Sequence, residues 1–493
     1  MPAWLTFLCN PVAFTMSDPR NRLGAPLNEY GESAPAPAVL PSALRSRIDR
    51  LLFKQIDVAP LVYFRILFGS IMLWEVTRYY SYDWIERYYI APQFFFTYYG
   101  FSWIEPWPGN LMYVHFLGLG ILAVFIILGL WYRASIILFS LGFTYVFLLD
   151  QANYLNHFYL VSWVGFLMIF VPAHRAVSLD VARKPELGVA TVPAWRQGLL
   201  CGIVAIPYFF GGLAKINEDW LNGEPMRMWL RGATDLPLAG SFLTEAWAPY
   251  FFSYSGLLLD LFVVPALIWR RTRPLAVVAL VGFHCLNAEI FSIGIFPWFM
   301  LLATPLFFDP RQLRFILYFE RFLGGPASTN AALLPTEGQR RWAPAFLGVL
   351  VAYHVFMPLR HHLYPGNVHW TEEGHNWSWH MKLRDKRGSL RLTATDMQTG
   401  ESWVINQRDY LTARQRRKMR TRPDLIVLFS HYLEKQLQKN GRGDIEIRAE
   451  ARLSLNARPR RLLIDPTVDL TQVKPSTRPA SWILPLETPL LVP

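Results

Sequence analysis

Nine stretches of this sequence are long and apolar enough to cross a lipid bilayer as helices. A spanning helix needs roughly 20 mostly apolar residues, because lipid offers no hydrogen-bond partner to a bare backbone. We expect spans at residues 60–78, 110–131, 134–150, 156–173, 197–214, 247–269, 274–292, 295–309 and 343–359. Gly294 and Pro297 favour a tight turn or broken helix after the seventh span. The predicted fold class is therefore a polytopic α-helical membrane protein with about eight or nine transmembrane helices.

The polar parts of the chain lie at its two ends. Residues 1–50 are expected to form a polar cytoplasmic segment, residues 51–360 the helical transmembrane domain, and residues 361–493 an extramembrane domain. In that last part, RLTATDMQTGESWVIN and DIEIRAEARLSLN alternate as strands do, and PDLIVLFSHYLEKQLQ has helical spacing. We therefore predict a C-terminal β-rich domain of α+β or sandwich-like type.

Basic residues flank alternate apolar stretches. Lysine and arginine concentrate in short cytoplasmic loops, so the basic segments before the first span, at Arg133, at 174–196 and at 270–273 indicate a cytoplasmic amino terminus. The C-terminal domain would then be periplasmic, extracellular or lumenal. The excess of 48 Lys and Arg over 36 Asp and Glu follows from this topology, and we do not expect nucleic acid as a partner.

Residues 1–15 lack a basic start and a cleavage site, so no signal peptide is expected.

The fifth apolar stretch ends on a charged residue, Lys215, within YFFGGLAKINEDWLNGEPM. Lysines at helix ends commonly extend to the membrane interface, which is one interpretation. The other is catalytic, because apolar surroundings disfavour the charged ammonium and a neutral amine is a general base. Gly211 and Gly212, just before it, permit close approach of a second helix.

Other polar residues are predicted on the same, non-cytoplasmic side. His157 opens the fourth span beside Asn156, and His284 and Asn287 share a helical face in the seventh. Polar groups at a membrane boundary and hydrogen bonds between helices are their ordinary roles. Five histidines occur in HHLYPGNVHWTEEGHNWSWH, but the spacing is not that of a zinc site, and we expect no metal.

Five sequence blocks together resemble the vitamin K-dependent gamma-glutamyl carboxylase family. The resemblance runs from about residue 55 to about residue 488. The blocks, in family order, are LLDQANYLNHFYL, YFFGGLAKINEDWLNGEPM, FHCLNAEIFSIGIF, WTEEGHNWSWHM, and IDPTVDL with SWILPL. The resemblance implies an enzyme that converts protein glutamate into γ-carboxyglutamate with O2 and CO2, and that couples this reaction to epoxidation of vitamin K hydroquinone. The family's base lysine falls on Lys215, and its supporting histidine falls on His157.

The resemblance also implies binding residues. Glutamate binding falls on the block that contains Trp377, Ser378, Trp379 and Met381, although His375 and Trp377 replace family tyrosines. The quinone is expected to contact residues of the other blocks, namely Asn156, Gly211, Gly212, His284, Asn287 and Phe291. The expected partners are a glutamate-containing protein or peptide, the lipid bilayer and a lipophilic quinone.

Two departures from the animal members leave alternatives open. Ala214 stands where those members have a second lysine, and their extramembrane cysteine pair is absent from this chain, which resembles the short bacterial relatives. Menaquinol is therefore an alternative cofactor, and a quinol oxygenase without carboxylation is an alternative activity. A non-enzymatic transporter or scaffold is a third hypothesis, although the inverted repeats typical of transporters are not evident.

Overall fold

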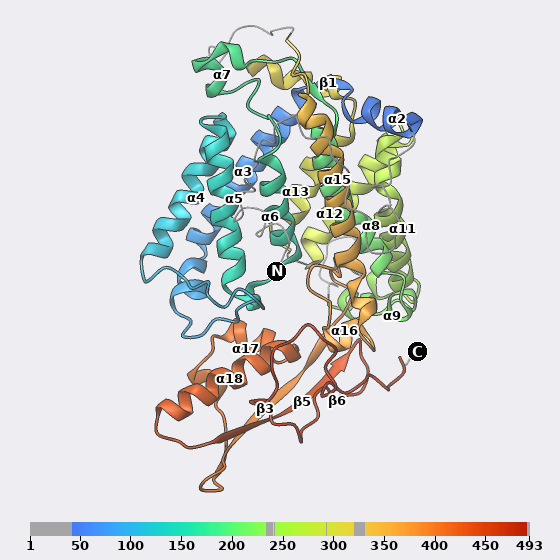
Figure 1. The fold of residues 1–493 in the computed structure, drawn as a ribbon. Coiled ribbons are helices and arrows are strands. Elements are labelled where there is room, and N and C mark those ends of the chain that lie inside the picture. The colour runs from blue at the N-terminus through green and yellow to red at the C-terminus, as the bar shows by residue number, and fades with distance from the viewer. Residues whose placement is uncertain (1–41, 233–239, 241, 292, 320–330, 491–493) are drawn as a thin grey trace, which may run out of the picture. The chain divides into compact units, whose positions relative to one another are not determined.

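The computed structural model describes residues 42–232, 240, 242–291, 293–319 and 331–490 (Figure 1). The chain divides into two units, residues 1–54 and 55–493. Within the first unit, the described residues contain helix α2 (Ser42–Leu52). The second unit contains the apolar helices and a small C-terminal sheet.

Seven of the described helices are long and apolar enough to cross a membrane, which confirms a polytopic helical architecture. They run beside one another in Figure 1. These helices are α3 (Ala59–Ser81), α4 (Leu111–Leu128), α5 (Tyr132–Leu149), α8 (Trp195–Ala214), α11 (Ala248–Ile268), α12 (Arg273–Phe291) and α15 (Glu337–Leu359), the last continued to Leu363 by a 3-10 turn.

Two of the nine expected spans are shorter than a full crossing. Helix α6 covers Asn156–Met168, and α13 covers Phe296–Ala303 before a 3-10 turn ends at Phe307. The 13 residues of α6 rise only about 20 Å, less than the roughly 30 Å of hydrocarbon. Both short helices pack on long ones, α6 on α5 and α8, and α13 on α3 and α12. The apolar runs that predicted these spans therefore also serve packing inside the helical bundle.

The C-terminal region contains an antiparallel sheet in the order β4-β3-β5-β6. Its strands are β3 (Lys386–Asp396), β4 (Ser402–Val404), β5 (Ile445–Leu455) and β6 (Arg461–Leu462), and its helices are α17 (Ala413–Met419) and α18 (Pro423–Lys439). Every second residue of β5 is buried, and the apolar face of α18 packs in the same core. The predicted hairpin, strand and helix are confirmed.

Hydrogen bonds tie this sheet region to the end of α5. Gln415 on α17 donates to Asp150 Oδ2 at 3.0 Å and to the Phe94 carbonyl at 2.7 Å. Arg414 donates to Asn153 at 2.7 Å. Burial raises the pKa of Asp150 to about 7, although the donors around it oppose that shift. The first turn of α17 is thus anchored on the loop that leads into α6.

Shorter elements complete the second unit. Strands β1 (Gln55–Asp57) and β2 (Thr191–Pro193) pair antiparallel. The short helices are a π-helical turn (Glu86–Ile90), α7 (Leu179–Arg183), α9 (Glu218–Leu221), α10 (Met226–Leu230) and α16 (Val368–Thr371), with 3-10 turns at Gln151–Asn153, Pro185–Leu187, Phe242–Thr244, Pro310–Phe319 and Gln407–Asp409.

Candidate active site

Lys215 lies where α8 ends, and the following residues explain why the helix stops there. The side chain of Asn217 donates to the Ala214 carbonyl at 2.8 Å and accepts from the Trp220 amide at 3.0 Å. Asn217 therefore caps α9 at its first turn while also satisfying a terminal carbonyl of α8. The Lys215 side chain turns back into the protein, and the residue is only 7% exposed.

The surroundings of Lys215 differ from the wholly apolar environment expected from the sequence. Its Nζ atom lies 2.5 Å from Oδ2 of Asp260 on α11 and 3.4 Å from the Gly211 carbonyl. The ammonium also lies 5.4 Å from the centre of the Trp220 ring. Asp260 is itself 5% exposed. Lys215 is thus part of a buried ion pair, because α11 brings a carboxylate to the position where only hydrocarbon was expected.

Glycines bring α8 and α11 close enough for this pair to form. A Cβ atom on Gly212 would lie 2.9 Å from the side chain of Leu261 on α11. A Cβ atom on Gly256 of α11 would lie 3.9 Å from Lys215 Cε. Gly212 therefore has the environment of a helix-packing residue, while Gly211 faces the ion pair, since its added Cβ would lie 3.4 Å from Asp260 Oδ2.

A second polar pair lies two turns before Lys215 on the same face of α8. The Tyr208 hydroxyl lies 2.8 Å from Nε2 of His284 on α12, and both side chains are buried. Tyr208, Gly211 and Lys215 follow the spacing of one helical face. In the described part of the chain, Nδ1 of His284 has no hydrogen-bond partner. That nitrogen is available to a ligand placed beside α8 and α12.

His157 reaches this region through an aromatic neighbour. The Phe296 ring lies 5.9 Å from the His157 ring and 6.3 Å from the His284 ring. Asn156 instead accepts a hydrogen bond from the Tyr154 hydroxyl at 2.8 Å. The structure therefore places His157 and His284 beside the same ring, that of Phe296, while Asn156 is hydrogen-bonded to the loop before α6.

The remaining two predicted quinone contacts follow His284 on α12. Asn287 lies one turn further along and is half-buried. The Phe291 ring packs 5.2 Å from Trp229 and 5.0 Å from Lys382 Nζ. Phe291 therefore joins α12 to α10 and to the segment before β3.

The segment that contains the predicted glutamate-binding residues packs directly on α6 and α8. Trp377 stacks 6.1 Å from Tyr159, and Trp379 lies 5.3 Å from the same ring. The Trp377 amide donates to the Tyr154 hydroxyl at 2.7 Å. A Cβ atom on Gly211 would lie 3.7 Å from Met381 Cε and 3.9 Å from the Trp379 carbonyl. Two sequence blocks more than 160 residues apart thus meet at Gly211.

The backbone of this segment is unusual. Five residues between 372 and 382 have positive φ angles, namely Glu372, Gly374, Trp377, Trp379 and Lys382. Such conformations cost of order 1–3 kcal/mol for non-glycine residues, and they concentrate where function needs a fixed geometry. Ser378 holds the turns together, because its hydroxyl lies within hydrogen-bonding distance of the carbonyls of Gly374 and Met357.

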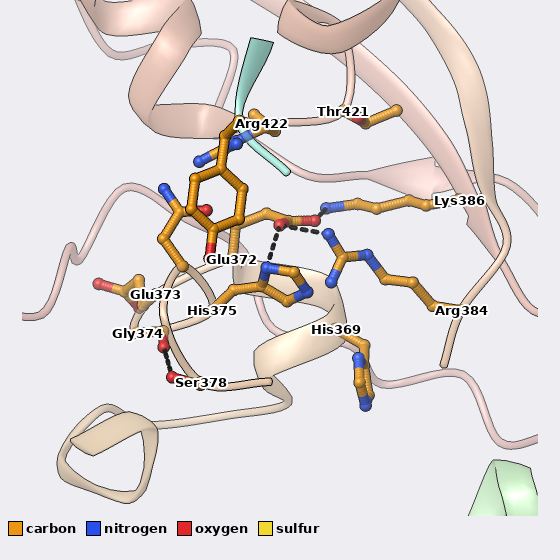
Figure 2. Close-up of polar contacts among 12 residues, drawn as sticks. His369, Glu372, Glu373, Gly374, His375, Ser378, Arg384, Lys386, Thr421 and Arg422 are labelled. Carbon is orange, nitrogen blue, oxygen red and sulfur yellow. Dashed lines mark hydrogen bonds and ion pairs between the residues drawn. The ribbon is translucent and has the colours of Figure 1, made fainter. Parts of the chain in front are cut away.

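A cluster of charged side chains surrounds Glu372 in the same segment (Figure 2). Glu372 accepts hydrogen bonds from Arg384 at 2.6 Å and from Lys386 at 3.3 Å, and it faces Nδ1 of His375 at 3.8 Å. Burial lowers the pKa of Lys386 to about 8, although Glu372 opposes that shift. Burial also places the pKa of His375 well below its usual value, with a further contribution from Arg384. His375 is therefore neutral beside the carboxylate.

The cluster has more positive than negative groups. Arg422 lies near Glu372 in Figure 2, and Lys418 has a pKa lowered to about 7 by burial and then by Arg414 and Arg422. In the described part of the chain, the buried Arg384 Nη1 and Arg422 Nε have no hydrogen-bond partner. Free N–H groups and surplus positive charge in a dry site favour binding of a carboxylate.

Sequence reasoning missed Asp260, Tyr208 and the group around Glu372. Asp260 had a clear signal, because it is the one charged residue within Ala248–Ile268. Ionisable residues inside a membrane span are expected to be functional, with a partner nearby. Arg384 and Lys386 follow the WSWHM block closely, but their spacing alone does not distinguish them from charges at the exposed start of a strand.

Comparison with protein-family models gives two matches that together cover most of the chain. Residues 53–311 match the HTTM domain, and residues 339–489 match the vitamin K-dependent gamma-carboxylase, lumenal domain. No solved structure matches the chain. The first match is longer than half the chain and contains Lys215, and the second contains the 372–382 segment. With seven apolar helices and a lumenal-type C-terminal region, this is an integral membrane protein. The chain belongs to the vitamin K-dependent gamma-glutamyl carboxylase family.

Proposed function

We propose that this protein is a membrane carboxylase that converts glutamate side chains of a protein or peptide into γ-carboxyglutamate. It would use O2 and CO2 and couple carboxylation to epoxidation of vitamin K hydroquinone or menaquinol. One observation carries the proposal. The Lys215 motif on α8 and the Trp379–Met381 segment meet at Gly211, so a proton acceptor and the family's lumenal region share one site.

The residues between α6, α8, α12 and α13 fit a lipophilic quinol. Phe296 offers an aromatic surface near His157 and His284, and Nδ1 of His284, which has no partner among the described residues, can hydrogen-bond a quinol hydroxyl. Tyr208 fixes the His284 ring through Nε2. When bound, the hydroquinone supplies, together with oxygen, a base strong enough to remove a γ-proton from glutamate. Lys215 would hold the proton given up by the quinol at Nζ.

The group around Glu372 supports the binding of a substrate carboxylate. Among the residues that the structure describes, Arg384 and Arg422 each have a buried N–H group without a partner, and arginine pairs with carboxylates through parallel hydrogen bonds. Trp379 is fully buried and Met381 lies against Gly211, so this part of the segment keeps water from the proton acceptor. Neutral histidines such as His369, whose pKa burial lowers to about 3, add no competing charge.

We also propose the orientation. With the amino terminus in the cytoplasm, the C-terminal sheet region lies on the non-cytoplasmic side. Lys215 ends α8 at the side of the membrane that carries this region. A polypeptide substrate would then approach from the aqueous phase and the quinol from the bilayer.

The test is a turnover assay with purified protein in nanodiscs, supplied with vitamin K hydroquinone or menaquinol, labelled bicarbonate and a glutamate-containing peptide. Wild type is compared with Lys215→Ala and with Lys184→Ala, a control at an exposed lysine. Epoxide and labelled peptide that form in wild type and Lys184→Ala and disappear together in Lys215→Ala would support the proposal. Epoxide without carboxylation would indicate a quinol oxygenase, and the absence of both products with either quinol would favour a transporter or scaffold.

A further inference from the structure

Asp260 is an acidic residue in the middle of an apolar helix, and within the described ranges its charged partner is Lys215. It lies 2.5 Å from Lys215 Nζ and is 5% exposed. An unpaired carboxylate at this depth would carry a large desolvation cost. The attraction between the two charges offsets part of that cost for each partner, and removal of either one would leave the other charge buried and unpaired. The position of Asp260 therefore depends on Lys215, and the reverse is also true.

The pair also determines where the amine points. Lys215 follows the last residue of α8, at the end of an apolar run, where a long lysine side chain would otherwise extend to the interface. Asp260 instead holds Nζ inward, beside the Gly211 carbonyl and over the Trp220 ring. In this position Nζ lies on the face of α8 that Met381 and Trp379 approach.

We infer that Asp260 is a positioning residue for Lys215 and that the two side chains accept a proton as one unit. The inference rests on the proposed function and names a residue on which its first proton transfer depends. It replaces a solitary neutral amine with a neutral pair. No metal or further cofactor is needed for this role.

The proton balance is the same for both forms of the pair. Lys–NH3⁺ with Asp–COO⁻ and Lys–NH2 with Asp–COOH contain the same number of protons, and each has zero net charge. When a weakly acidic hydroxyl is presented to Nζ, one O–H bond breaks and one N–H or carboxyl O–H bond forms. The product is Lys–NH3⁺ with Asp–COOH, whose single positive charge faces the newly formed anion. Without Asp260, the acceptor would have to be a free amine.

The titratable groups facing the pair come from two packed elements. Tyr208 on α8 interacts electrostatically with Asp260, and His284 on α12 is hydrogen-bonded to Tyr208. From α9 and from the segment before β3, the pair is faced by Trp220 and Met381, which do not titrate. A change in the pH dependence of an Asp260 variant can therefore be separated from Tyr208 and His284 with the variants Tyr208→Phe and His284→Gln.

The first readout does not depend on activity. Lys215 in the apoprotein is acylated with a lipophilic amine-reactive reagent between pH 6 and pH 9, and its labelling rate is measured by mass spectrometry. We expect Asp260→Asn to label Lys215 about tenfold faster or more, because loss of the carboxylate frees Nζ from the ion pair and acylation needs an unpaired amine. Asp260→Glu should remain close to wild type. Glu75→Gln, which removes the carboxylate of another buried pair, with Arg78, should leave Lys215 labelling unchanged.

The second readout is epoxide formation. Asp260→Asn should lower kcat about tenfold or more and shift the pH midpoint of kcat, with little change in the quinol KM, and Asp260→Glu should restore part of kcat. Unchanged Lys215 labelling in Asp260→Asn, or wild-type kcat with a wild-type pH profile, would overturn the inference. If wild type forms no epoxide, the proposed function fails while the labelling still decides whether Asp260 holds Lys215.

If Asp260→Asn does not fold, Lys215→Arg replaces it as the test variant. Lys215→Arg keeps the charge pair but cannot release its proton, so it should fold and be inactive. Activity in Lys215→Arg would refute the inference.

Discussion

Arg458 and Asp219 form the buried ion pair whose removal has the most predictable effect on stability. Asp219, four residues after Lys215, accepts hydrogen bonds from both terminal nitrogens of Arg458 at 2.6 Å and from Asn456 at 2.6 Å. Both charged residues are 5% exposed. The pair joins α9 to the turn that follows β5. It therefore holds the segment that begins at Lys215 and the C-terminal sheet region in a fixed relation.

Replacement of Arg458 by methionine leaves the Asp219 carboxylate buried with one remaining donor. Removing one partner of a buried pair typically costs about 3–5 kcal/mol. If residues 215–221 open locally, their amide hydrogen exchange should accelerate by roughly 10²- to 10³-fold or more, because 1.4 kcal/mol is a factor of ten. The double variant Asp219→Asn with Arg458→Met should exchange more slowly than the single variant, since no charge is then left unpaired.

Hydrogen exchange followed by mass spectrometry in nanodiscs provides the assay. The matched control is Arg452→Met, because Arg452 pairs with Glu450 at 2.6 Å on the exposed side of β5, and exposed pairs contribute only about 0–1 kcal/mol. Exchange of residues 215–221 that rises less than about threefold in Arg458→Met, or as much in Arg452→Met, would refute the reasoning.

Three further predictions follow from single contacts. Gly212→Ala should lower the unfolding temperature, since its Cβ would lie 2.9 Å from Leu261, whereas Gly202→Ala on the same helix meets no atom within 4 Å and should not. The folded-state pKa of Asp150 is raised from 3.8 to about 7, so its contribution to stability is present below about pH 4 and is lost as the pH rises through 7. Asp150→Asn should therefore flatten the fall in unfolding temperature between about pH 4 and pH 7. Tyr154→Phe removes the acceptor of the Trp377 amide, and exchange of that amide should accelerate about tenfold, as expected for the loss of roughly 1–3 kcal/mol.

The long apolar helices could be predicted from the sequence because their composition alone determines them. The lengths of α6 and α13 could not, because an apolar run of 15 to 18 residues is compatible with a short buried helix as well as with a full span. Strands β3 and β5 were predictable from alternation, since one face of the sheet packs on α18 while the other faces water.

The candidate site was predictable only where a residue type is rare in its surroundings. Lys215 stands out at the end of an apolar run, and Asp260 stands out equally well. What the sequence does not show is that these two residues meet, because that depends on glycines at the contact between α8 and α11. The arrangement around Glu372 depends on five positive φ angles, for which single residue identities such as Trp377 and Trp379 give no indication. The assignments of Lys215 as the base, of His157, of the quinone contacts and of the glutamate contacts stay predictions.

The meeting of Met381 and Trp379 with Gly211 has a consequence for the biosynthesis of the protein. Lys215 and Asp260 are both synthesised at least 119 residues before Trp379. During translation α8 and α11 can pair, but the segment that contains Trp379 and Met381 cannot cover Gly211 until the chain has grown past residue 381. A nascent chain already inserted in the bilayer thus contains the Lys215–Asp260 pair but lacks the segment that shields it. The order of synthesis therefore leaves the Lys215–Asp260 pair uncovered until most of the protein has been made.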